Sequence, residues 1–469
     1  MDAKKEMRFL QNAGRRAERL VLGPRNGERC VRMMTSALIA ASAPTVAPHP
    51  AMILPFAVML LSIALMPFIH KHWWEHHYPK LAVGLGLLTT AYYVFFLNNG
   101  GRMLLVAHEY ISFIALVGSL FVVSGGIHIR VKGEAIPSVN CLFLLIGAVL
   151  ANIIGTTGAS MLLIRPWIRM NKYRITSFHI VFFIFIVSNV GGCLTPIGDP
   201  PLFLGYLRGV PFWWVLETCW EAWLVAVLGM ISIFYVLDRK NFLRAPRKVR
   251  DAETAQETWQ FDGLSNLFFL GLILVAVFLK QPPGLSEGLM IAAAIGSYFT
   301  TRKPVHQAND FSFEPIREVA WLFVGIFATM VPALDYLEVN AGQLGLNSEM
   351  KFFWFTGALS GALDNAPTYL TFLAAAMGRH HLSLNSRADV QEFVTHHDHE
   401  LIAISLGAVF FGAMTYIGNG PNFMVKSIAE RAKVKTPGFF DYLLRYAVPI
   451  LLPFFAIISL LFFSKWRVF

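Results

Sequence analysis

The segment TPIGDPP, residues 195–201, interrupts a long apolar region of the chain. HIVFFIFIVSNVGG (179–192) precedes it and LFLGYL (202–207) follows it. Proline cannot donate a backbone hydrogen bond and breaks the interior of a helix, and a carboxylate is costly in hydrocarbon. Irregular backbone at membrane depth persists only where protein or a water-filled cavity satisfies its polar groups. The segment therefore predicts a membrane helix that is broken at a functional position.

The composition indicates a membrane protein. Of the 469 residues, 55% are hydrophobic and 14% are charged, and apolar runs repeatedly reach the ~20 residues that span hydrocarbon. Two apolar segments, 138–168 and 351–377, carry glycine and polar residues at their centres and are treated separately below. We expect full crossings near 51–69, 80–97, 104–124, 177–206, 212–237, 264–280, 285–300, 319–338, 400–430 and 441–464.

Net charge, cysteine content and the first 50 residues limit the possible functions but do not define one. The net charge of +10 is compatible with nucleic-acid binding, but the distribution of loop charges favours the positive-inside rule instead. The four cysteines form no CxxC pair, so neither a disulfide framework nor a structural metal site is expected. Residues 1–50 are basic at first and then weakly apolar, which fits either a signal segment or a start codon placed too early. We assign them no function.

An internal repeat marks the same region twice. TPIGDPPL (195–202) matches TYIGNGPN (415–422) at an offset of 220 residues. Upstream of each copy, GAVLANIIGTTGAS (147–160) lies opposite GALSGALDNAPTYL (357–370). The order of the two features is the same in both halves, so we expect a first repeat over 51–237, a cytoplasmic linker over 238–263, a second repeat over 264–464 and a short tail over 465–469.

Loop charges predict the orientation of the repeats. If 138–168 and 351–377 are re-entrant hairpins, each half has five crossings, and the second half is inverted. The loops on one side of the membrane then carry 20 Lys and Arg residues and those on the other side carry 7. Basic loops face the cytoplasm. The predicted fold is therefore an all-α polytopic membrane protein with two inverted repeats, each of five transmembrane helices, one re-entrant hairpin and one broken helix.

Inverted repeats with broken helices are typical of secondary transporters that bind ions near the bilayer midplane. In the first half the hairpin tip is expected at Asn152 and 155–158, near the break at 195–201. In the second half the tip is expected at 364–368, near the break at 415–422. Freed carbonyls, hydroxyls, amides and carboxylates are hard oxygen ligands, which suit a small cation such as Na⁺.

Each half brings one acidic residue to this region. Asp199 lies opposite Asn419 in the repeat, and Asp364 lies opposite Gly155. Burial favours the protonated form of a carboxylate, so such a group can exchange a proton for Na⁺. The alternative for Asp199 is a purely structural N-cap, because an aspartate followed by proline also starts a helix. Asn152, Ser188 and Asn189 have an alternative role as hydrogen-bonding residues between helices.

Two histidine-rich segments and one glutamate lie outside this region. HKHWWEHH (70–77) is expected in a cytoplasmic loop and HHDHE (396–400) in an external loop. Histidine titrates near ~6.5, so either segment can bind metal or sense pH, but a solvated loop without function is the simpler interpretation. Glu109, beside His108, fits an interfacial position or a proton path.

TPIGDPP, the DNAPT tip (364–368) and TYIGNGPN together resemble the ion transporter superfamily, which contains NhaD-type sodium/proton antiporters, arsenite permeases, and citrate and dicarboxylate transporters. The resemblance covers residues 51–464. It implies a scaffold domain and a transport domain of hairpins and broken helices, often in a homodimer. It also implies that the ligands of the transported Na⁺ are Thr156, Thr157, Asn189, Thr195, Asp199, Asp364, Asn365, Thr368, Thr415, Asn419 and Asn422.

The tips differ from those of the sodium-coupled dicarboxylate branch, where Ser-Asn-Thr occurs at both. Here the first tip is Gly-Thr-Thr-Gly and the second is acidic, and two carboxylates repel a carboxylate substrate unless cations neutralise them. We therefore expect exchange of Na⁺ or Li⁺ for H⁺ across the cytoplasmic membrane by alternating access. The alternative is cation-coupled citrate or dicarboxylate transport.

An enzyme is not expected, because no HExxH or GxSxG motif lies at membrane depth. No cofactor and no nucleic-acid partner are expected either. The expected partners are the lipid bilayer, small cations and protons.

Overall fold

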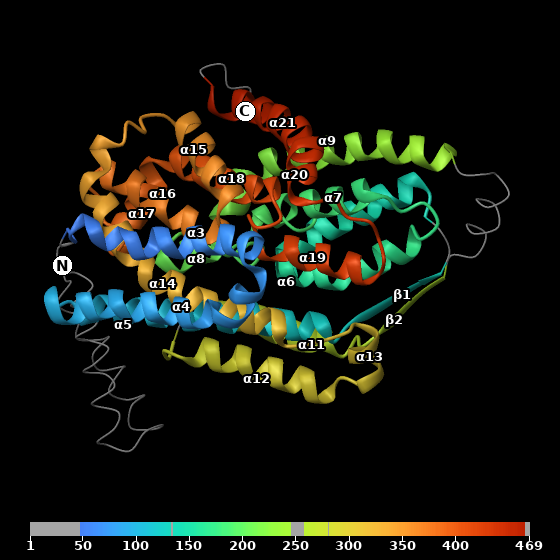
Figure 1. Ribbon diagram of the computed structural model, residues 1–469, viewed down its shortest axis with the longest axis horizontal. Helices are drawn as coiled ribbons and strands as arrows, with labels where there is room; N and C mark the ends of the chain where they lie inside the picture. Colours follow the sequence, from blue (N-terminus) through green and yellow to red (C-terminus); the bar gives the residue numbers. More distant parts are fainter. Residues whose placement is uncertain (1–46, 133–134, 245–257, 280, 465–469) are drawn as a thin grey trace, which may run out of the picture.

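The structure is a computed structural model that describes residues 47–132, 135–244, 258–279 and 281–464 (Figure 1). The predictions for residues 1–46 and for the tail 465–469 lie outside these ranges, as does half of the predicted linker 238–263. The described part of the chain is predominantly helical. Eight of its helices or continuous helical runs are long and apolar enough to cross a membrane. These runs are Pro50–Pro67, Lys71–Phe96, Gly100–Gly125, Pro137–Met170, Ser177–Leu194, Trp214–Arg244, Glu314–Gln343 and Phe439–Phe463.

The α-helical, polytopic character of the fold is thus confirmed. Three expected crossings correspond to helices of fewer than 18 residues: α11 (Asn266–Phe278), α12 (Leu285–Thr300), which has the expected bounds, and α18 (Asp398–Phe411). Other short elements are η1 (Pro50–Ile53), η2 (Tyr92–Phe96), α13 (Lys303–Ala308), η4 (Ala341–Gln343), α17 (Arg387–His396), α20 (Phe439–Tyr442), η6 (Leu443–Leu451) and α21 (Leu452–Phe463).

The helices form two groups that pack mainly within themselves. We call the first group the frame; Figure 1 shows its helices α4, α5 and α12 along one side of the molecule. The frame consists of α3 (Leu54–Ile69), α4 (Lys71–Ala91), α5 (Gly100–Gly125), α11, α12 and α14 (Glu314–Asn340). The second group contains the hairpins and the broken helices and meets the frame chiefly through α5 and α14.

Each half contains a helical hairpin at the predicted position. Helix α6 (Pro137–Met170) is interrupted at Gly155, which has φ 76° and ψ 155°. Its two ends meet, because the amide of Ala135 donates to the carbonyl of Met170 at 2.9 Å. In the second half, α15 (Glu349–Ala362) and α16 (Asn365–Arg379) meet at Leu363 and Asp364. The path of these hairpins through the membrane, and the inversion of the repeats, stay predictions.

The two broken helices share their local structure. After α7 (Ser177–Ile186), a short turn, η3 (Val190–Leu194), leads to an extended Thr195 and then to α8 (Pro200–Arg208). After α18, the turn η5 (Gly412–Met414) leads to an extended Thr415 and then to α19 (Gly420–Arg431). The Thr195 hydroxyl accepts from the amide of Gly198 at 3.1 Å, and the Thr415 hydroxyl accepts from that of Gly418 at 3.0 Å. The sequence repeat is therefore also a repeat of backbone conformation.

Two regions differ from the expected loops. Residues 70–77 do not form a loop, because α4 already begins at Lys71. The imidazoles of His76 and His77 bond to carbonyls one turn earlier, at 2.8 and 2.9 Å, and Trp74 is buried. The segment around 396–400, expected in an external loop, is also ordered, into the end of α17 (Arg387–His396) and the start of α18. In both segments, polar composition alone therefore did not distinguish a helix from a loop.

A small antiparallel sheet is the exception to the expected all-α fold. Strand β1 (His128–Lys132) pairs with β2 (Thr258–Asp262), so that His128 lies opposite Asp262. Alternation of apolar and polar residues in β1 suits a half-buried strand, and Ile129 is buried while Arg130 is ion-paired to Asp262 at 2.8 Å. The described end of the predicted linker is therefore attached to the loop after α5. Helix α9 (Trp214–Arg244) also extends beyond its expected end at 237.

Candidate functional site

Asp199 lies where both hairpins and the second break meet. It is 1% exposed. One carboxylate oxygen accepts from the Thr156 hydroxyl at 2.8 Å and from the Asn419 amide at 2.9 Å. The other accepts from the Asn365 amide at 2.6 Å. A single carboxylate therefore joins the first hairpin tip, the second hairpin tip and both broken helices.

The two prolines after Asp199 explain why its side chain is available for these contacts. Asp199 occupies the N-cap position of α8, but its side chain makes no capping hydrogen bond. An N-cap side chain accepts from the amide of the second or third helical residue. Pro200 and Pro201 have no amide hydrogen, and the amide of Leu202 donates to the backbone carbonyl of Asp199 at 3.1 Å. The helix therefore does not compete for the carboxylate.

A chain of buried amides continues from Asp199 across the two halves. The Asn419 side chain also donates to the Asn189 side-chain oxygen at 3.2 Å, and Asn189 donates to the Asn422 side-chain oxygen at 2.7 Å. Asn422 in turn donates to the carbonyls of Gly412 and Thr415 at 2.8 and 2.9 Å. Buried amides with satisfied partners fix one geometry, so the two breaks are held in register with each other.

A cavity of about 20 Å³ lies beside the carboxylate, between the first tip and α5. Its volume is that of a single water molecule or a monatomic ion. Its lining is formed by Thr156, Thr157, Ile154, Gly155, Pro196, Ile197, Gly198, Asp199, Pro200 and Phe203, with Leu116, Val117 and Leu120 of α5. Close by, the side-chain oxygen of Asn365 is buried and has no hydrogen-bond partner in the described part of the chain. The site thus presents an unused oxygen acceptor next to a carboxylate.

The structure places the other predicted ligands at different distances from this centre. The Thr195 and Thr415 hydroxyls donate to the carbonyls of Asn152 and Gly361, at 2.6 and 2.8 Å, and thereby tie each break to its hairpin. Asp364 caps α16 by accepting from the amide of Ala366 at 3.0 Å, and no hydrogen bond joins it to Asp199. Thr368 donates to the carbonyl of Asp364 at 2.8 Å. A role for these residues as ion ligands stays a prediction.

The surroundings of the site contain charged contacts that the sequence did not predict. Glu109 of α5, considered for a proton path, accepts from Arg208 at the end of α8 at 2.8 Å. Its neighbour His108 instead lies 3.9 Å from Glu287. A buried ion pair also joins Arg102 of α5 to Asp335 of α14. A charged residue in an apolar segment is the available signal for such pairs, but the partner lies far away in the sequence.

Comparison with known proteins agrees with this architecture. The chain is similar to two uncharacterized transporters of Mycobacterium tuberculosis, from strains CDC 1551 / Oshkosh and ATCC 25618 / H37Rv. Each is 26% identical over 264 residues, which cover 52% of this chain and 58% of the relative. The chain therefore matches a little more than half the length of these relatives. A family described as putative citrate transport matches residues 47–463, which is nearly the whole chain, and the protein belongs to this family of membrane transporters.

Proposed function

We propose that the protein is a secondary active transporter that exchanges Na⁺ for H⁺ at Asp199. One observation carries this proposal: a buried carboxylate is held only by neutral donors, namely one hydroxyl and two amides. Among the described residues, no Lys, Arg or His side chain forms an ion pair or a hydrogen bond with it. A buried charge without a partner is strongly unfavourable. A proton or a small cation is therefore the natural counter-charge of Asp199.

The oxygen atoms around Asp199 suit Na⁺ in particular. The carboxylate and the Thr156 hydroxyl are hard oxygen ligands, and the side-chain oxygen of Asn365 is unused. Rotation of an asparagine amide exchanges a donor for an acceptor of nearly the same size. On Na⁺ binding, the amides of Asn365 and Asn419 are expected to turn their oxygens toward the ion. On protonation of Asp199, the site loses its negative charge and Na⁺ leaves, so the two cations compete.

Cation-coupled citrate transport is the second candidate. The description of the family as putative citrate transport favours it. In that case Asp199 binds the coupling cation, and the anion needs a larger space, since binding cavities for small molecules typically measure about 300–1,000 Å³. The cavity beside Asp199 measures about 20 Å³, which matches a single ion and is the reason why we place exchange first.

Proton movement in vesicles tests both functions. The purified protein is reconstituted in proteoliposomes with a pH-sensitive dye, and NaCl, LiCl, KCl and citrate are added in turn. Exchange gives a pH change with NaCl alone that is absent in Asp199→Asn. Sodium-dependent uptake of labelled citrate, without a pH change on NaCl alone, supports the second candidate. Ser297→Ala, which changes a buried hydroxyl of α12 in the frame, serves as the matched control.

A further inference from the structure

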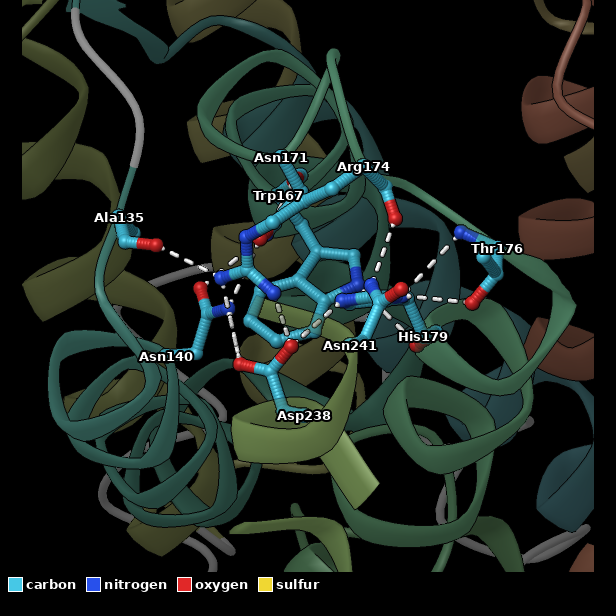
Figure 2. A network of polar contacts seen from close by, with 9 residues as sticks. All are labelled: Ala135, Asn140, Trp167, Asn171, Arg174, Thr176, His179, Asp238 and Asn241. Atoms are coloured by element: carbon cyan, nitrogen blue, oxygen red, sulfur yellow. Dashed lines mark hydrogen bonds and ion pairs between the residues drawn. The ribbon is translucent and has the colours of Figure 1, made fainter. Parts of the chain in front are cut away.

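A buried polar network closes the base of the first hairpin, opposite its tip. Figure 2 shows Asp238 of α9 between Arg174 and His179, with Ala135 and Asn140 close by. Arg174 forms an ion pair with Asp238 and donates to the carbonyl of Ala135 at 2.7 Å. Asn140 donates to Asp238 at 2.8 Å. Because Ala135 and Asn140 lie at the start of the hairpin and Arg174 lies just after its end, one carboxylate holds both ends together.

The same network reaches the broken helix. His179 lies in the first turn of α7 and is fully buried. Its Nδ1 accepts from the backbone amide of Thr176 at 3.2 Å, so this nitrogen carries no hydrogen. Its Nε2 therefore carries the hydrogen and donates to Asp238 at 3.1 Å. The tautomer of His179 is fixed because the Thr176 amide can only donate a hydrogen bond. The network therefore joins the base of the first hairpin to α7, the helix that leads to TPIGDPP.

The second hairpin is closed by the same four kinds of group. Arg379, the last residue of α16, donates to the carbonyl of Leu346, before α15, at 2.7 Å. The guanidinium also forms an ion pair with Glu400 of α18, and the imidazole of His380 lies 3.2 Å from the same carboxylate. Helix α18 leads to the second break. Each base thus combines an arginine, a carboxylate, a histidine and a backbone carbonyl at the other end of the hairpin.

Arginine is suited to this arrangement because its planar fork of donors reaches a carboxylate and a carbonyl at once. We refer to the two sets as the first clamp (Arg174, Asp238, His179) and the second clamp (Arg379, Glu400, His380). The clamps share no sequence motif, and their residues come from different elements. Their common feature is the place that they occupy, at the base of a hairpin and beside a broken helix.

We propose that the two clamps are positioning devices for the cation site, which fix each hairpin against its broken helix so that Thr156 and Asn365 reach Asp199. The inference rests on the proposed function, since it takes the tips to serve a cation. The arm from Asn140 to Thr156 is about 24 Å long at 1.5 Å per residue. A tilt of about 5° at the base moves the tip by about 2 Å, which exceeds the tolerance of a hydrogen bond.

Hydrogen–deuterium exchange of the purified protein tests the clamps directly, without any assumption about the substrate. We expect Asp238→Asn to accelerate exchange at the first tip, residues 152–158, by about tenfold, and Glu400→Gln to do the same at the second tip, residues 362–368. Amides of α11 and α12 should not change. His179→Gln should resemble the wild type, because a glutamine amide can accept from Thr176 and donate to Asp238. Ser297→Ala controls for the loss of a buried polar group in the frame, outside both clamps.

A second readout separates positioning from simple stabilisation. In folded Asp238→Asn and Glu400→Gln variants, the Na⁺ concentration for half-maximal proton movement should rise about tenfold, whereas a purely structural role lowers only the amount of folded protein. Unchanged hydrogen–deuterium exchange at both tips, or equal acceleration of this exchange throughout the chain, overturns the proposal. If Asp238→Asn does not fold, Glu400→Gln decides, because its clamp is partly exposed. If the wild type moves no protons on addition of Na⁺, the proposed function is contradicted. The comparison of hydrogen–deuterium exchange rates at the two tips still decides whether the clamps position the tips.

Discussion

The side-chain amide of Asn365 lies 2.6 Å from a carboxylate oxygen of Asp199, although 166 positions separate the two residues in the sequence. The contact joins the second hairpin tip to the first break. Thr156, on the first tip, reaches the same carboxylate at 2.8 Å. A cation that binds Asp199 must compete with both tips for its oxygens. Occupancy of the site is therefore linked to the position of both hairpins.

Thr156 and Asn419 provide a test of a shared site, because both donate to the same oxygen of Asp199. Thr156→Val and Asn419→Ala should each weaken the apparent affinity for Na⁺. Their effects should not add, and the interaction free energy should be about 0.5–3 kcal/mol, the range for residues in one hydrogen-bond network. Titration of Na⁺ against proton movement in the two single variants and the double variant measures it. Additive effects contradict a common site.

Gly155 should be intolerant of any side chain. Its φ of 76° and ψ of 155° lie in a region that is essentially restricted to glycine. An added Cβ would also lie 3.2 Å from the carbonyl of Ile197. Gly155→Ala should therefore lower the free energy of unfolding by about 1–3 kcal/mol, as measured by thermal unfolding in detergent.

Gly84→Ala is the matched control for this substitution. Gly84 lies inside α4, and a Cβ there meets no atom within 4 Å. Alanine should stabilise this helix by about 0.5–1 kcal/mol relative to glycine. Opposite shifts of the melting temperature in the two variants support the strained tip, and equal shifts contradict it.

The broken helices and hairpin tips could be predicted because their signals are local. Pro196, Pro200 and Pro201 interrupt an apolar run, and a nearly equivalent segment recurs 220 residues later. Proline and glycine within a membrane segment leave few conformations open. The equivalence of Thr195 and Thr415 is preserved down to the hydrogen bond that each makes with a following glycine amide.

The contacts between the halves could not be predicted, because they depend on which faces meet in space. Asn365 was predicted at a tip, but nothing local indicates that it donates to Asp199 rather than caps its own helix. Asp238 was assigned to a polar linker, yet it is fully buried in an ion pair with Arg174. The pairing of β1 with β2 is equally remote in sequence. A charged residue indicates that a partner exists, and only the fold identifies the partner.

Asp364→Asn separates two roles of the second tip. Asparagine caps a helix about as well as aspartate, so α16 should keep the bond from the Ala366 amide that Asp364 accepts at 3.0 Å. Folding should be unchanged. If the charge of Asp364 contributes to cation binding, the Na⁺ concentration for half-maximal exchange should rise. Exchange should nevertheless persist, unlike in Asp199→Asn, because no hydrogen bond joins Asp364 to Asp199. An unchanged Na⁺ dependence would restrict Asp364 to capping.

The ion pair between Glu109 and Arg208 should be important for the contact between α5 and α8. Its side chains are 15% and 5% exposed, and Arg208 also donates to the Asn385 side chain at 3.0 Å. Glu109→Gln removes the carboxylate that pairs with the buried guanidinium of Arg208. We expect the free energy of unfolding to fall by about 3 kcal/mol, at the lower end of the range for a broken buried pair because Glu109 retains some access to solvent.

Glu75→Gln is the matched control, since it breaks an exposed ion pair with Lys71. The side chains of Glu75 and Lys71 are 54% and 76% exposed, so this substitution should change the free energy of unfolding by less than about 1 kcal/mol. Thermal unfolding of both variants at low and high salt provides the measurement, because salt screens an exposed pair much more than a buried one. A loss of the same size in both variants would show that the Glu109 pair is no more than a surface contact.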